Sequence, residues 1–131
     1  KRVKKYGLEE QFELCPFTKE IQKHYLSASI YAMTSAFEGL PLVLVEAESM
    51  GLPLVSYACP CGPRDIIRDG QDGFLVEPGN QKAFASRLRQ LIEDEELRRR
   101  MGQAAKINSQ RFSLENVMKQ WVDLFAELTA E

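Results

Sequence analysis

Several residue types that would indicate a special class of protein are scarce in this sequence. The 131 residues include one histidine, one tryptophan and three cysteines. The 17 basic side chains nearly balance the 19 acidic ones, so the net charge of -2 argues against a broad nucleic-acid surface. No apolar run approaches the roughly 18 residues that a membrane span needs. What remains is the composition of an ordinary globular domain, with 44% hydrophobic and 27% charged residues.

The cysteines, Cys15, Cys59 and Cys61, do not form a recognisable framework. An odd number without a regular spacing indicates reduced thiols and a cytosolic compartment. The C-x-C pair at 59–61 could hold a metal, but it has no second pair and no histidines beside it. We therefore interpret it as a loop with two free thiols.

The start of the chain indicates a piece of a longer protein. Lys1 is not preceded by a methionine, no signal peptide is visible, and the first residues read as the end of a helix. We expect one domain, residues 1–131, that is truncated relative to its parent. Its sheet is expected over about residues 8–79 and its C-terminal helices over about residues 80–129.

Strand and helix signals alternate along the chain, which predicts an α/β domain with a parallel sheet. Apolar runs predict strands at 30–33, 53–57 and 74–76, with a further short strand at 12–14. Helices are predicted over 1–6, 18–27, 41–50 and 64–68 and in the region after 80. Thr18 and Ser113 are candidate N-caps, and Trp121 and Phe125 are expected to anchor the packing of the last helix.

Two glutamates eight positions apart, Glu38 and Glu46, bracket the segment EGLPLVLVE. Gly39 and Pro41 precede an apolar run, so the segment is predicted to be a loop that turns into a helix with Pro41 in its first position. Glu38 then lies in the loop, and Glu46 lies about one and a half turns into the helix. A helix N-terminus offers free N–H groups to a phosphate. One acid on each side of it could hold the hydroxyls of a sugar diphosphate.

This run and two further blocks resemble the retaining nucleotide-sugar glycosyltransferases of family 4, whose two Rossmann-like domains form the GT-B fold. The run SAFEGLP at 35–41 is followed by EAESMGLPLV at 46–55 and by GPRDIIRDGQDGFLV at 62–76, in the family's order. The resemblance covers about residues 8–91 well and the terminal helices more loosely. It implies the C-terminal, donor-binding domain, a Rossmann-like parallel sheet flanked by helices with a helical C-terminus.

The resemblance also implies roles for individual residues. Glu46 matches the carboxylate that accepts hydrogen bonds from the ribose hydroxyls, and Glu38 matches the acid near the donor sugar and the leaving phosphate. Backbone N–H groups around Gly39 and Leu40 approach the diphosphate in related enzymes. No metal or other cofactor is implied, because amides, the helix dipole and basic side chains handle the phosphate charge. The expected donor-binding residues are Glu46, Gly39, Leu40, Pro41 and Phe37, with Glu38 as the catalytic residue.

Each of these charged residues also has a simpler interpretation. Glu38 could be a solvated loop carboxylate, and Glu46 could face water in the way expected of Glu48. Arg64 is a candidate phosphate contact, but it could equally pair with a neighbouring aspartate such as Asp65 or Asp69. The arginines and acids between residues 87 and 100 are interpreted as a solvated, salt-bridged face and not as a membrane surface.

The chain also departs from the family pattern. By the resemblance, we expect the first βαβ stretch to be missing, and with it the arginine and lysine that clamp the diphosphate in relatives. We expect the acceptor domain to be missing as well. His24 does not match the histidine found near the donor sugar in relatives and is interpreted as an exposed helix residue. The sequence CGPRD at 61–65 replaces two glycines and a later glutamate, which leaves the role of Asp65 open.

Together these features predict a domain of a retaining glycosyltransferase that binds a nucleotide-sugar donor. The parent would transfer the sugar to a carbohydrate or lipid-linked acceptor, as in polysaccharide or lipopolysaccharide synthesis, while the isolated chain is expected to be inactive. A nucleotide-sugar epimerase and a non-catalytic binding or assembly module are the alternatives. We expect a cytoplasmic protein, with peripheral association at the inner membrane face as a candidate property of the parent. Self-association through an exposed sheet edge is a further expectation.

Overall fold

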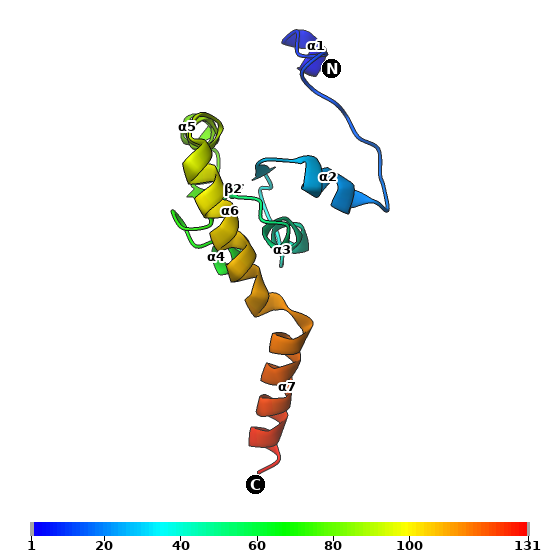
Figure 1. Cartoon of the computed structure of the whole chain (residues 1–131), viewed down its shortest axis with the longest axis vertical. Helices are drawn as coiled ribbons and strands as arrows, with labels where there is room; N and C mark the ends of the chain where they lie inside the picture. Colours follow the sequence, from blue (N-terminus) through cyan, green and yellow to red (C-terminus); the bar gives the residue numbers. More distant parts are fainter. Residues whose placement is uncertain (1, 131) are drawn as a thin grey trace.

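A parallel sheet of three strands forms the centre of the computed structural model, which describes residues 2–130 (Figure 1). The strands are β1 (Tyr31–Met33), β2 (Leu54–Tyr57) and β3 (Gly73–Val76), in that spatial order. Ala32 pairs with Val55, which in turn pairs with Phe74. Within the described residues β1 has β2 as its one partner, so its outer edge is unpaired. Self-association through this edge stays a prediction.

Helices lie on both faces of the sheet, as expected of parallel strands. The helices are α1 (Arg2–Lys5), α2 (Ile21–Ser27), α3 (Leu42–Ser49), α4 (Pro63–Ile66), α5 (Gln81–Glu93), α6 (Glu95–Ser109), the 3-10 helix η1 (Gln110–Phe112) and α7 (Leu114–Leu128). Successive residues of β2 point to opposite faces. Leu54 packs in a buried cluster with side chains of α2, α3 and α4, whereas Val55 packs in a second cluster with side chains of α5 and α6.

The strands predicted at 30–33, 53–57 and 74–76 are confirmed, but the one predicted at 12–14 is wrong. Phe12 and Leu14 lie in an irregular segment and are 51% and 81% exposed. A strand needs a neighbouring strand to satisfy its backbone groups, and the three-stranded sheet offers this segment none. An apolar pattern alone was therefore misleading here.

Two predicted helix starts need correction, and one is confirmed. Thr18 does not cap α2, which begins at Ile21; its Oγ1 instead accepts the Glu20 N–H at 3.0 Å in a local turn. Pro41 directly precedes the first helical residue and does not occupy the first helical position. Ser113 caps α7 by accepting the Asn116 N–H at 3.2 Å. The predicted helix over 1–6 corresponds to α1, and its first position, Lys1, lies outside the described residues.

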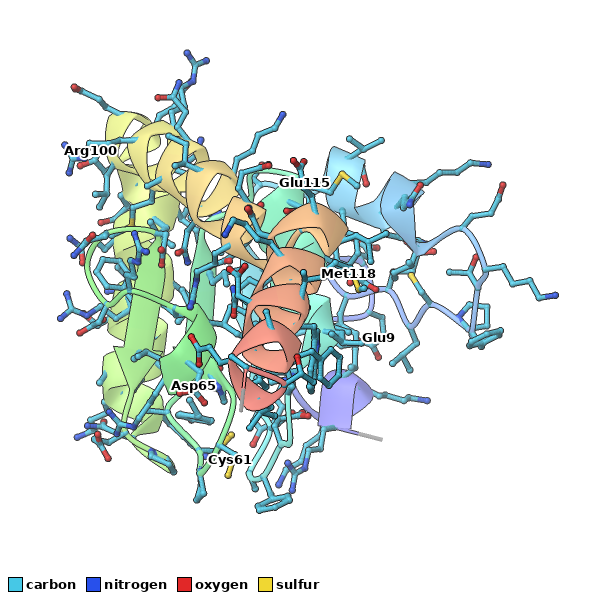
Figure 2. The ribbon with its side chains drawn as sticks, turned by 90° about the horizontal axis from the view of Figure 1, so that it is seen from below. Glu9, Cys61, Asp65, Arg100, Glu115 and Met118 are labelled. Atoms are coloured by element: carbon cyan, nitrogen blue, oxygen red, sulfur yellow. The ribbon has the colours of Figure 1, made fainter. Side chains whose placement is uncertain are left out.

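The last helix extends away from the rest of the domain (Figure 1). None of the described residues of α7 is buried. Trp121 and Phe125, which were expected to anchor its packing, are 50% and 57% exposed and stack on each other with ring centroids 5.7 Å apart. Figure 2 looks along this helix, with Glu115 and Met118 marked on it. Within this chain the apolar face of α7 is therefore open.

The end of α3 and the middle of α6 approach each other closely at two glycines, Gly51 and Gly102. A Cβ added to Gly102, on α6, would lie 2.3 Å from the carbonyl oxygen of Gly51, the residue that follows α3 with a φ of +77°. Only glycine allows this separation, because real Cβ atoms essentially never come this close to a backbone oxygen. The backbone contact fixes the spacing between α3 and the C-terminal helices.

Replacing Gly102 with alanine therefore tests the packing of α3 against α6. In an exposed helix this change stabilises by about 1 kcal/mol, because alanine is the better helix former. Here we expect it to destabilise the domain by about 1–3 kcal/mol, because the added methyl group forces the helices apart. Urea unfolding followed by circular dichroism measures the difference. Gln103→Ala, at the exposed next position, is the control and should be neutral or slightly stabilising; equal or higher stability of Gly102→Ala would contradict the close contact.

Candidate functional site

The loop from Thr34 to Leu40 leaves the carboxyl end of β1 and leads into α3. Ligands of open α/β sheets bind at this end of the strands. The loop carries Glu38, which is half-buried, and α3 carries Glu46, which is exposed. Of the other predicted donor-binding residues, Gly39 is exposed and Pro41 is buried, and the structure exposes 74% of Phe37 and 55% of Leu40. The loop is thus open to a ligand along most of its length.

The charges of Glu38 and Glu46 both raise the pKa of one tyrosine, Tyr31. Burial raises the pKa of Tyr31 above its ordinary value, and the charges of Glu46 and then Glu38 raise it further. Tyr31 and Glu46 also line one cavity, and Glu38 comes from the loop that leads into the helix carrying Glu46. The fold brings the two predicted site residues into one region.

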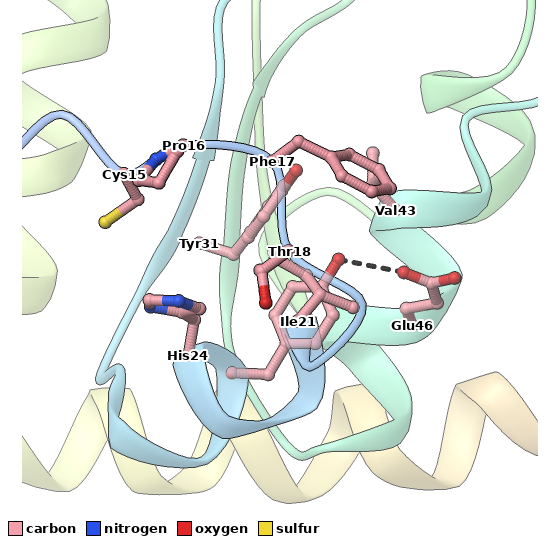
Figure 3. Close-up of a pocket in the computed structure, with 10 residues that line it drawn as sticks. Cys15, Pro16, Phe17, Thr18, Ile21, His24, Tyr31, Val43 and Glu46 are labelled. Atoms are coloured by element: carbon pink, nitrogen blue, oxygen red, sulfur yellow. Dashed lines mark hydrogen bonds between the residues drawn. The ribbon is translucent and has the colours of Figure 1, made fainter.

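Glu46 is held by a second tyrosine that the sequence had suggested only as an apolar residue. The hydroxyl of Tyr25, on α2, donates a hydrogen bond to Glu46 Oε2 at 2.9 Å (Figure 3). The pKa of the Tyr25 phenol lies well above its ordinary value, first because of burial and then because of this hydrogen bond and the charge of Glu46. Tyr25 therefore keeps its proton and remains a donor.

A cavity of about 600 Å³ lies beside this pair (Figure 3). Its walls come from the segment before α2, from α2 itself, from β1 and from the outer side of α3: Cys15, Pro16, Phe17, Thr18, Ile21, His24, Tyr25, Tyr31, Val43 and Glu46. His24 is exposed, as predicted, and lies on the wall of this cavity. The size is within the range of small-molecule sites, and Glu46 is the acidic group in its wall.

The loop before α3 packs against the loop before α4. A Cβ added to Gly62 would lie 2.3 Å from Pro41 Cδ and 2.4 Å from the carbonyl oxygen of Gly39. Asp65 Oδ2 accepts the Gly62 N–H at 3.1 Å and so fixes this turn, in which Cys61 and Gly62 both have positive φ. Figure 2 shows Cys61 on the loop and Asp65 on the helix that follows. Asp65, whose role the sequence left open, therefore has a structural partner.

Arg64 pairs with an acid that the sequence did not suggest. Its guanidinium lies 2.9 Å from Glu77 Oε1, and both side chains are largely exposed. The nearby Asp69 instead accepts the Leu75 N–H at 2.9 Å. An exposed ion pair contributes only about 0–1 kcal/mol, so Arg64 can exchange Glu77 for another anion. Whether it contacts a phosphate stays a prediction.

Glu48 was expected to face water, and this expectation is wrong. Its side chain is fully buried on the inner side of α3, where the amide of Asn108 donates to its two oxygens at 3.3 and 3.5 Å. Burial, and next the charge of Asp72, raise the pKa of Glu48 to about 7. The Asn108 hydrogen bond and the charge of Arg111 act in the opposite direction.

The hydrogen-bond network around Glu48 extends to α4. Asn108 also donates to the Ile66 carbonyl at 2.8 Å, and its own Oδ1 accepts the Arg111 Nε–H at 3.0 Å. Arg111 donates further to the carbonyls of Asp65 and Ile66 at the end of α4. Because Asn108 lies 60 positions after Glu48, no local pattern in the sequence could have shown this network.

The three cysteines are free thiols, with Cys59 buried and Cys15 and Cys61 exposed. Among residues 2–130 no group of three or more His, Cys, Asp or Glu side chains is placed to hold a metal ion. In the same range no helix combines the length and the apolar character needed to span a bilayer.

Comparison with known proteins gives a consistent family. The model of the family described as Glycosyl transferases group 1 matches residues 1–108. The amylovoran biosynthesis glycosyltransferase AmsD of Erwinia amylovora is 42% identical over 123 residues, which are 94% of this chain and 34% of AmsD. The chain thus spans about a third of the length of this relative.

Solved structures share the fold. The crystal structure of HepE from Anabaena in complex with UDP superposes with a TM-score of 0.89 at 26% identity, covering 96% of this chain and 35% of HepE. The C-terminal domain of the glycosyl transferase group 1 family protein LpcC from Francisella tularensis gives a TM-score of 0.75 at 27% identity. That match covers 86% of this chain and 60% of the LpcC domain.

The buried carboxyl of Glu48 predicts a characteristic dependence of stability on pH. Its pKa of about 7 lies above the ordinary value of 4.5, so the folded state binds more protons than the unfolded state between these values. The contribution of Glu48 is therefore fully present below pH 4.5 and is lost as the pH rises through 7. The expected loss is on the order of 3 kcal/mol.

Glu48→Gln should remove this loss, because glutamine does not ionise. Urea unfolding between pH 4.5 and 8, with Glu115→Gln on exposed α7 as the control, measures it. The pKa of Asp72 is also raised by burial and gives a change of the same sign, so the difference between wild type and Glu48→Gln isolates Glu48. Parallel pH profiles of the two proteins would show that Glu48 does not titrate in this range.

Proposed function

This chain belongs to the glycosyl transferases group 1 family, and we propose that it binds the nucleoside-diphosphate sugar from which a retaining glycosyltransferase takes the sugar. Its sheet and helices are those of a C-terminal domain of the GT-B fold, as the resemblance predicted. The structure of HepE with UDP supports a nucleoside diphosphate as part of the ligand.

The observation that carries the proposal is the position of Glu46 relative to the start of α3. Glu46 lies four residues after Leu42, the first residue of the helix, so about 6 Å separate the two along the helix axis. Its carboxylate lies on the wall of a cavity of about 600 Å³. A nucleoside in this cavity with its ribose at Glu46 can direct its diphosphate toward the helix start. Within residues 2–130 no side chain caps that helix start; the Leu44 N–H donates to the Pro41 carbonyl at 2.9 Å, which leaves the N–H groups of Leu42 and Val43 for a phosphate.

Five of the predicted site residues then have a role in binding or transfer. Glu46 accepts hydrogen bonds from the ribose hydroxyls, because a carboxylate is an acceptor only. Backbone N–H groups at Gly39 and Leu40 and the start of α3 stabilise the charge that grows on the diphosphate as it leaves. Glu38, whose charge reaches the same tyrosine as that of Glu46, lies on the side of the donor sugar and stabilises its oxocarbenium-like state. Arg64 exchanges Glu77 for a phosphate oxygen.

Transfer itself is part of the proposal for the whole protein. Because the chain spans about a third of AmsD, we propose that the acceptor, a carbohydrate or lipid-linked saccharide, binds outside these 131 residues. The chain alone then binds donor without transferring sugar. The relation to an amylovoran biosynthesis enzyme supports polysaccharide synthesis as the process. The supply of nucleotide sugars favours the cytoplasm, including the inner face of the membrane, as the location.

Glu46→Ala tests the ribose contact. Titration calorimetry with UDP, GDP and ADP should select one nucleotide for the wild-type chain. Glu46→Ala should weaken its binding about 10- to 100-fold, because hydrogen bonds to a charged group contribute about 1.5–3 kcal/mol. Glu93→Ala, at an exposed position of α5, is the matched control and should bind like wild type. Equal affinity of Glu46→Ala and wild type would refute the assignment of Glu46.

Glu38→Gln tests whether Glu38 acts at the sugar. We expect the variant to bind the selected nucleoside diphosphate within about twofold of wild type, since no contact with the nucleoside is proposed. Its affinity for the corresponding nucleotide sugar should fall about fivefold or more, because the carboxylate charge near the sugar is lost. Calorimetry with both ligands measures the two affinities. A loss of the same size for both would place Glu38 at the phosphates or the nucleoside instead.

A further inference from the structure

We infer that Tyr25 is a positioning residue for Glu46: its hydroxyl orients the Glu46 carboxylate toward the cavity that takes the ribose. The inference rests on the proposed donor site and adds a residue to it. The roles proposed above for the two glutamates and for the loop before α3 do not use the hydrogen bond from the Tyr25 hydroxyl to Glu46 Oε2. This bond is 2.9 Å long and is drawn as the dashed line in Figure 3.

Tyr25 is a rigid anchor. Its residue is only 5% exposed and belongs to the buried cluster that also contains Met33 and Leu44. Its ring lies 5.9 Å from the ring of Tyr31 in a tilted arrangement that aromatic pairs favour. Packing on several sides fixes the ring, so the position of the hydroxyl is set by the core and not by the ligand.

Glu46 is less restrained by packing than Tyr25. It is exposed, and in the described part of the chain its carboxylate accepts a hydrogen bond from the hydroxyl of Tyr25. Glu46 lines the large cavity and also a smaller one of about 130 Å³ bounded by Ile21, Gln22 and Ser49. A glutamate has three rotatable side-chain bonds, so its carboxylate can turn toward either cavity or into solvent. The bond to Tyr25 selects one of these orientations before the ligand arrives.

The Glu46 carboxylate can accept hydrogen bonds from the Tyr25 phenol and from the ribose hydroxyls at the same time. Burial and the charge of Glu46 raise the pKa of Tyr25, so the phenol stays protonated and donates at neutral pH. The carboxylate accepts from it through Oε2 and keeps Oε1 for the ribose hydroxyls. Phenol and ribose therefore do not compete for the same lone pairs, and a ligand with a free 2′-hydroxyl gains from a carboxylate already in place.

Tyr25→Phe tests the inference, because it keeps the packed ring and removes only the hydroxyl. The ligands are whichever of UDP, GDP and ADP the wild-type chain selects and its 2′-deoxy form, measured by titration calorimetry. We expect the variant to bind the ribonucleotide about three- to tenfold more weakly than wild type and the 2′-deoxy form almost unchanged. The preference for the ribose form should therefore fall, while a merely structural role of Tyr25 would weaken both ligands alike.

A double-mutant cycle shows whether Tyr25 acts through Glu46. Adding Tyr25→Phe to Glu46→Ala should cause no further loss of affinity, because the carboxylate that Tyr25 orients is gone. Tyr57→Phe is the matched control: its ring is also partly buried, 4.8 Å from that of Phe84, and it should keep the wild-type preference.

Three outcomes would overturn the inference, and they are distinguishable. If Tyr25→Phe keeps the full preference for the ribose form, Tyr25 does not position Glu46, and the donor site itself stands. If Tyr25→Phe weakens binding as much in the Glu46→Ala background as in wild type, Tyr25 acts independently of Glu46. If the wild-type chain binds none of the three nucleotides, the proposed donor site fails and the inference fails with it.

Discussion

The hydrogen bonds of Asn108 to one buried carboxylate hold the inner face of α3 in the domain. Glu48 is fully buried, and a carboxylate in that position is costly unless polar groups contact it. Asn108 supplies that contact and also holds the end of α4 through the Ile66 carbonyl. Glu46 lies two positions before Glu48 on the same helix, and residues two apart lie on nearly opposite sides. Fixing Glu48 inward therefore directs Glu46 outward, toward the cavity.

Two close backbone contacts complete the placement of α3. At its start, Gly62 lies against the loop that contains Gly39 and Pro41, and at its end Gly51 lies against Gly102 of α6. Neither contact leaves room for a side chain. Together with the polar contact in the middle of the helix, they hold α3 at both ends and at its inner face. Glu46 therefore lies on a helix with little freedom to shift, which favours a preorganised carboxylate.

The sequence was most informative where local patterns decide the structure. Apolar runs located β1, β2 and β3, and Ser113 marked the start of α7, because burial and capping act over a few neighbouring residues. It failed at Phe12–Leu14, whose pattern suits a strand that has no neighbour to pair with. It also failed for Glu48 and missed the hydroxyl of Tyr25, because their partners are 60 and 21 positions away. The spacing of Glu38 and Glu46 indicated a candidate site, but it could not reveal the hydrogen bond from the Tyr25 hydroxyl to Glu46.

The contacts of Arg111 connect the candidate site, through α4, to the last helix, α7. Arg111 lies in η1, directly before α7, and its guanidinium donates hydrogen bonds to the carbonyls at the end of α4. The start of α4 in turn rests on the loop that carries Gly39. Arg111 therefore connects α7, a helix of 15 residues and about 22 Å, to the segment against which the loop before α3 packs.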